Sequence, residues 1–69
     1  SLSLDDIIKQ LDPARFFRVN RQFIVNIDSI SQLKTYFAGK ARVYLKEYED
    51  IEIMCSRERV PILKSWLNK

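Results

Sequence analysis

The sequence contains no histidine and only one cysteine among its 69 residues. A single cysteine excludes an internal disulfide, and the usual zinc ligand sets cannot form without histidine. A Ser-His-Asp catalytic set is likewise impossible, and Cys55 has no histidine to activate it. We therefore expect no metal, no cofactor and no enzyme activity, and we interpret Cys55 as a small buried side chain of a cytoplasmic protein.

Long hydrophobic runs and a leader segment are also lacking. No apolar stretch is long enough to cross a bilayer, and the first ten residues carry acids rather than a basic and then a hydrophobic segment. We therefore expect no membrane association. A chain of 69 residues forms at most one small domain, which buries only roughly 60% of its unfolded surface. We take residues 1–69 as a single domain.

Charge is present in quantity, and its distribution is uneven. Residues 13–46 carry seven basic residues and one acid, whereas residues 47–52 carry four acids and no base. This polarity predicts a basic face for an anionic partner and an acidic edge elsewhere. A solvated surface whose charge is merely uneven is the alternative interpretation.

Residues 15–27 are the most informative run, because they interleave three arginines with three phenylalanines and contain no acid. Aromatic and β-branched residues favour a buried sheet, whereas guanidinium groups favour water, carboxylate or phosphate. The run must therefore fold with one apolar surface and one cationic surface. A phosphate backbone is a natural external partner for the cations.

Two helices are predicted, one near each end of the chain. Ser3 is a predicted N-cap with Asp6 as its capping-box partner, and Pro13 follows the end of this helix. The helix spans residues 3–11 and carries one apolar stripe, formed by Leu4, Ile7, Ile8 and Leu11.

The second helix is predicted over residues 57–67, with Ser56 as its N-cap. Proline is comfortable only in the first turn of a helix, so Pro61 predicts an irregular start and regular geometry after residue 59.

Between the helices, the alternation of apolar and polar residues predicts strands separated by polar turns. The only glycine, Gly39, lies in the tripeptide 38–40, which is the predicted tip of a β-hairpin. The fold class is therefore α+β and mostly β, an antiparallel meander flanked by two short helices. The predicted strands cover residues 16–19, 23–27, 30–37, 41–46 and 51–54, with turns at 20–22 and 47–50.

Two segments together resemble the LytTR-type DNA-binding domain of bacterial response regulators. The first is the run 15–27 followed by Ile30, and the second is 55–59 followed by an apolar helix. A leucine-rich helix before the basic run also suits this family. Domains of the family are usually about a third longer and carry additional N-terminal strands, so the chain is expected to be the C-terminal part of such a domain.

The resemblance implies sequence-specific binding of double-stranded DNA by the output domain of a bacterial two-component transcriptional regulator. It implies a mostly β fold whose loops enter the major groove, an upstream receiver domain, and a homodimer that binds paired sites. Asn20 stands where the family often has His and Gln22 where it often has Ser, so a different recognised sequence is expected.

Seven residues are the candidate DNA contacts. Arg21 is the first choice, because it lies in the polar turn between two apolar segments and can bind guanine or phosphate. A solvated turn arginine is the alternative, and Glu58 could pair internally with its arginine neighbours. The full set is Asn20, Arg21, Gln22, Lys40, Arg42, Arg57 and Arg59.

Two other functions stay open at this stage. A small protein-interaction module could pair its exposed strand edges with a partner chain. A single-strand binder would stack bases on the aromatic residues, although core packing explains the phenylalanines better.

Overall fold

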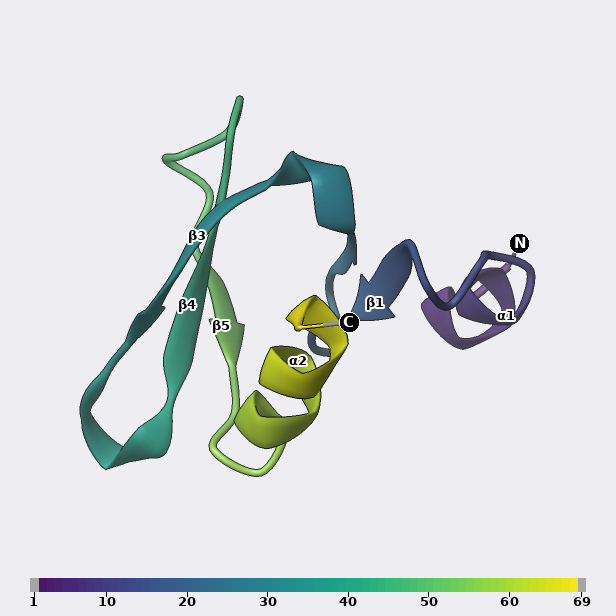
Figure 1. Ribbon diagram of the computed structural model, residues 1–69. Helices are drawn as coiled ribbons and strands as arrows, with labels where there is room; N and C mark the ends of the chain where they lie inside the picture. Colours follow the sequence, from purple (N-terminus) through teal and green to yellow (C-terminus); the bar gives the residue numbers. More distant parts are fainter. Residues whose placement is uncertain (1, 69) are drawn as a thin grey trace.

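Each predicted element has a counterpart in the computed structural model, which describes residues 2–68. Five strands form two antiparallel sheets, and one helix lies near each end of the chain (Figure 1). In chain order the elements are α1 (Leu4–Lys9), β1 (Phe16–Arg18), β2 (Ile24–Asn26), β3 (Ile30–Thr35), β4 (Ala41–Leu45), β5 (Ile53–Cys55) and α2 (Val60–Leu67), with short 3-10 turns at Ile27–Ser29 and Phe37–Gly39.

The strands pair in the order of the sequence. β1 and β2 form a hairpin around the turn 20–22, and β3, β4 and β5 form a three-stranded sheet with β4 in the centre. This arrangement confirms the α+β meander predicted from the sequence.

The core lies between the three-stranded sheet, the β1–β2 hairpin and α2. The alternation predicted for β4 is confirmed, because Ala41 and Val43 are fully buried while Arg42 and Tyr44 lie on the other face. The buried set is Phe17, Val19, Val25, Ala41, Val43, Ile53, Cys55, Val60, Leu63 and Trp66.

The two helices differ in how much they bury. α2 places three apolar side chains in the core, and the ring of Trp66 stacks on Phe17 with 5.1 Å between centroids. α1 has the predicted capping box between Ser3 and Asp6 but contains no buried residue. It packs on β1 through a half-buried stripe and stands apart from the three-stranded sheet (Figure 1).

Most element boundaries differ from those predicted by one to three residues, and the differences at the starts of β5 and α2 have physical causes. β5 begins at Ile53, because Ile51 lies in the preceding turn with 36% of its surface exposed. α2 begins at Val60, and its N-cap is Arg59 rather than Ser56. Pro61 lies in the first turn of this helix, where a missing backbone N–H costs no hydrogen bond.

Candidate nucleic-acid interface

Three turns that are far apart in the sequence meet at one end of the three-stranded sheet. Ala41 pairs with Cys55, so the β3–β4 tip and the segment after β5 leave the sheet at the same end (Figure 1). We call this end, formed by the turns 20–22, 36–40 and 56–59, the loop end.

Gly39 allows the hairpin tip to lie against the turn 56–59. Its φ is +77°, a backbone conformation that favours glycine, and the preceding Ala38 also has a positive φ of 61°. A Cβ atom added at Gly39 would lie only 2.7 Å from Cγ of Arg57. The only glycine of the chain therefore serves both the turn and the close packing of the Arg57 stem.

Asn20 fastens the turn 20–22 to the same end. Its Nδ2 donates to the carbonyl oxygen of Met54 at 2.8 Å. Its Oδ1 accepts hydrogen bonds from the backbone N–H groups of Gln22 at 2.8 Å and Phe23 at 3.0 Å. An asparagine that binds the backbone two residues further on is typical of a polar turn. The sequence analysis placed Asn20 at the interface but missed that its side chain shapes the turn.

A hollow on the loop end has an apolar floor formed by Val19, Met54 and Cys55, and cationic and neutral polar side chains also line it. The polar lining residues come from the three turns and are Asn20, Arg21, Lys40, Ser56 and Arg59. No acidic residue lines this hollow among the described residues. Cations gathered without a matching acid raise the local concentration of anionic ligands, so the hollow suits a phosphate backbone.

The exposed cations at the loop end are Arg21, Lys40 and Arg57. Arg57 is paired with the neighbouring Glu58 at 3.9 Å, and both side chains are more than 70% exposed. An ion pair this exposed contributes little and leaves the guanidinium available to another anion. Gln22 is also exposed in the turn 20–22, next to Arg21.

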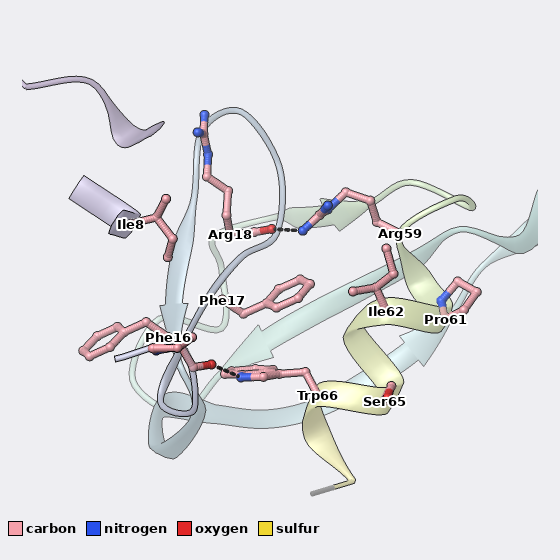
Figure 2. A pocket seen from close by; sticks show the side chains of 10 residues that line it. Ile8, Phe16, Phe17, Arg18, Arg59, Pro61, Ile62, Ser65 and Trp66 are labelled. Atoms are coloured by element: carbon pink, nitrogen blue, oxygen red, sulfur yellow. Dashed lines mark hydrogen bonds between the residues drawn. The ribbon is translucent and has the colours of Figure 1, made fainter. Parts of the chain in front are cut away.

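Arg59 is half-buried and has internal partners, unlike those three cations. Its Nη2 donates to the carbonyl oxygen of Arg18 at 2.7 Å, and its guanidinium lies 4.9 Å from the centroid of the Phe17 ring (Figure 2). Its Nε is buried without a hydrogen-bond partner within residues 2–68. Arg59 therefore joins α2 to β1, with its charge held beside the hollow.

Three candidates, Gln22, Arg57 and Arg42, do not line the hollow, and of these only Arg42 lies outside the turns of the loop end. It lies on the outer face of β4, and its guanidinium reaches toward the acidic turn, with Nη2 donating to the Glu49 carbonyl at 3.3 Å and Nη1 lying 4.0 Å from Glu52. The guanidinium also lies 4.5 Å from the centroid of the Tyr44 ring. It stabilises the phenolate of Tyr36 and so lowers the pKa of that side chain.

Arg18 is the residue at this end whose contacts the sequence did not specify. Its Nε donates to the Asn20 carbonyl at 3.0 Å and its Nη2 to the Arg21 carbonyl at 3.1 Å. Its Nη1 forms an ion pair with Asp5 of α1. The family resemblance indicates that Arg18 is a structural arginine that pairs with an acid or a carbonyl, and the structure shows that its partners are Asp5 and the carbonyls of Asn20 and Arg21.

Cys55 lies beneath the hollow and is fully buried, as predicted. Burial raises the pKa of its thiol, against the opposing effect of the Arg59 charge. Within residues 2–68 no three His, Cys, Asp or Glu side chains are grouped to hold a metal, and no helix there is long and apolar enough to cross a membrane.

Comparison with known proteins agrees with the resemblance found in the sequence. The LytTr DNA-binding domain family matches residues 1–68. A transcriptional regulatory protein of Escherichia coli, YpdB, is 30% identical over 59 residues, which are 86% of this chain and 24% of that protein. An uncharacterised response regulatory protein of Vibrio cholerae is 35% identical over 43 residues, which are 62% of this chain and 16% of that protein.

The chain thus spans about a quarter or less of the length of these relatives. No solved structure gives a significant match. The family match covers nearly the whole chain, and its residues include all three turns of the loop end. The chain belongs to the LytTR family of DNA-binding domains.

Proposed function

We propose that the chain binds double-stranded DNA in a sequence-specific manner through its loop end. The observation that carries this proposal is the meeting of the three turns: Arg21 and Lys40 line one hollow with no acidic lining residue within residues 2–68, and Arg57 is exposed beside Gly39 of the hairpin tip. Membership of a DNA-binding family supports DNA as the anionic partner.

The candidate residues divide into two roles under this proposal. Arg21, Gln22, Lys40 and Arg57 are exposed and contact the duplex, with Arg21 reading a base edge or clamping a phosphate. Asn20 and Arg59 hold the turns in place and contribute at the edge of the contact. Arg42 reaches DNA only if the duplex extends over the outer face of the sheet, because its guanidinium faces the acidic turn.

We further propose that the full-length protein is a non-enzymatic transcriptional regulator of a two-component system. The relatives are a transcriptional regulatory protein and a response regulatory protein, each much longer than this chain. An upstream receiver domain would account for the difference in length, and a homodimer would bind paired sites. Reading the coding sequence on the 5′ side of Ser1 tests the receiver domain directly.

The experiment that tests sequence-specific binding is selection from a random duplex library, followed by fluorescence anisotropy. We expect enrichment of one motif and at least a thousandfold tighter binding to it than to a scrambled duplex, the lower end for specific DNA-binding proteins. Equal affinity for all duplexes would reduce the proposal to non-specific binding. Preference for single strands of the same sequence would contradict it.

A further inference from the structure

We propose that Arg18 is a positioning residue for DNA binding, which fixes the turn 20–22 and couples it to α1 through Asp5. The expected effect on DNA binding rests on the proposed function. The coupling between α1 and the turn 20–22 is a property of the protein alone and can be measured without DNA. The inference concerns a residue outside the seven candidate contacts.

The first step is the way in which Arg18 binds the turn. Two nitrogens of one planar guanidinium donate to two successive carbonyl oxygens, those of Asn20 and Arg21. Because the guanidinium is rigid, these two bonds fix the carbonyls relative to each other. Arg21, the leading candidate for reading a base, therefore has its backbone held from one side by Arg18.

The second step is the way in which Asn20 completes the turn. Its Oδ1 accepts from the N–H groups of Gln22 and Phe23, so side chains satisfy both the carbonyls and the amides of this turn. The turn 20–22 is thus held by side-chain hydrogen bonds, and its shape depends on where Arg18 points. The side chain of Arg18 is 21% exposed, and it extends away from the core alongside the turn (Figure 2).

The third step is the partner that directs Arg18. Its remaining terminal nitrogen, Nη1, pairs with the Asp5 carboxylate in the first turn of α1. This is the only ion pair of α1 within the described residues, and α1 otherwise packs on β1 through its half-buried apolar stripe. Asp5, Arg18 and Arg21 line one hollow between α1 and the turn. A displacement of α1 would therefore be transmitted to the turn that presents Arg21.

A matched ion pair in the same part of the chain provides the control. Arg15 pairs with Asp28 at 2.9 Å, also thirteen residues away in sequence, and neither residue bonds to the turn 20–22. Asp5→Asn and Asp28→Asn each remove one exposed negative charge, so they change the net charge of the protein equally. Only Asp5→Asn changes the direction of Arg18.

The experiment measures amide hydrogen exchange at Gln22 and Phe23, together with the ratio of affinities for the preferred and a scrambled duplex. We expect Asp5→Asn and Arg18→Lys to speed exchange at both amides about tenfold, because the turn opens locally more often. We expect the affinity ratio to fall about tenfold in both variants, while the thermal midpoint and the salt dependence stay near those of the parent. Asp28→Asn should change neither the exchange nor the ratio.

Arg18→Lys separates positioning from a phosphate contact. Lysine keeps the charge but cannot form the two-pronged bond to successive carbonyls. If Arg18→Lys behaves like the parent while Arg18→Ala weakens all duplexes alike, Arg18 only contacts phosphate and the proposal is overturned. Unchanged exchange in Asp5→Asn would also overturn the coupling. If the parent binds no duplex, the proposed function fails, while the exchange measurements still decide whether Arg18 and Asp5 hold the turn.

Discussion

The two ends of the central strand β4 carry opposite charge and are organised differently. At the loop end, Lys40 and the neighbouring turns present cations, while the backbone of the turn 20–22 is bonded by the half-buried side chain of Asn20 and by the guanidinium of Arg18. At the other end, the guanidinium of Arg42 donates to the carbonyl oxygen of Glu49 in the acidic turn 47–50 and lies near the carboxylate of Glu52.

The difference shows that placement, rather than net charge, distinguishes the two ends. The net charge is only +3, yet the acids are concentrated beyond the C-terminal end of β4, where Arg42 partly neutralises them. The loop end retains exposed cations, and within residues 2–68 the only acid that pairs with one of them is the exposed Glu58. An anionic ligand therefore meets an attractive surface at one end of the sheet and a repulsive one at the other.

The largest effect is expected when the shared core that holds both ends is broken. Phe17 is buried beneath Arg59 and Trp66, and Phe17→Ala should cost about 3–5 kcal/mol of unfolding free energy. A domain this small unfolds as one unit, so both ends should be lost in a single urea transition.

Phe37→Ala is the matched control for that change. Phe37 is 81% exposed at the hairpin tip, so its truncation should alter the unfolding free energy by less than about 0.5 kcal/mol. Comparable destabilisation by the two variants would show that the core has been assigned wrongly.

A smaller effect is expected when one cation is removed from the loop end. Arg21→Ala should weaken binding to the preferred duplex by about 1–3 kcal/mol and relax the preference at one position if Arg21 reads a base. Its side chain is exposed, so the unfolding transition should hardly move. Anisotropy titrations against duplexes substituted one position at a time measure both results; an unfolded variant or parent-like binding would refute the assignment.

The smallest effect is expected from the thiol beneath the hollow. Burial places the pKa of Cys55 in the folded state above its value of about 8.5 in the unfolded chain. Below about pH 8.5 the thiol is protonated in both the folded and the unfolded state, so the stability that its burial contributes is present in full. As the pH rises further, the unfolded chain ionises first, so stability falls.

Urea titrations between pH 7 and 10 should therefore show a steeper loss of stability for the parent than for Cys55→Ala. Subtracting the unfolding free energies of the two proteins at each pH removes the contribution of the lysines and tyrosines, which both proteins share. Identical slopes would mean that the thiol is accessible at the loop end and that the hollow reaches further into the core.

Local patterns in the sequence predicted most of the fold. The capping residues Ser3 and Asp6, the alternation through β4 and the tip at Gly39 act over a few residues, so they are visible without tertiary information. The start of α2 was misplaced because Ser56 resembles an N-cap, whereas the chain makes one further turn before Val60.

The site was only partly predictable, for a physical reason. Arginines of similar local context received different partners, which are distant in sequence. Arg59 reaches β1, Arg42 reaches the acidic turn, and Arg21 remains exposed. The family resemblance indicated the turn 20–22, but the packing of Gly39 against Arg57 depends on the pairing of β4 with β5 and has no local signal.

The most direct test of the central claim compares the two lysines that flank β4. Lys40 lies at the loop end and Lys46 at the acidic end, and both are exposed. The two lysines are separated by about 20 Å of extended chain, so each reports on one end. The measurement is the slope of the logarithm of the binding constant for duplex DNA against the logarithm of the salt concentration. The account predicts that Lys40→Ala makes this slope shallower by about one, while Lys46→Ala leaves it unchanged. Equal changes in both variants, or a change confined to Lys46→Ala, would contradict it.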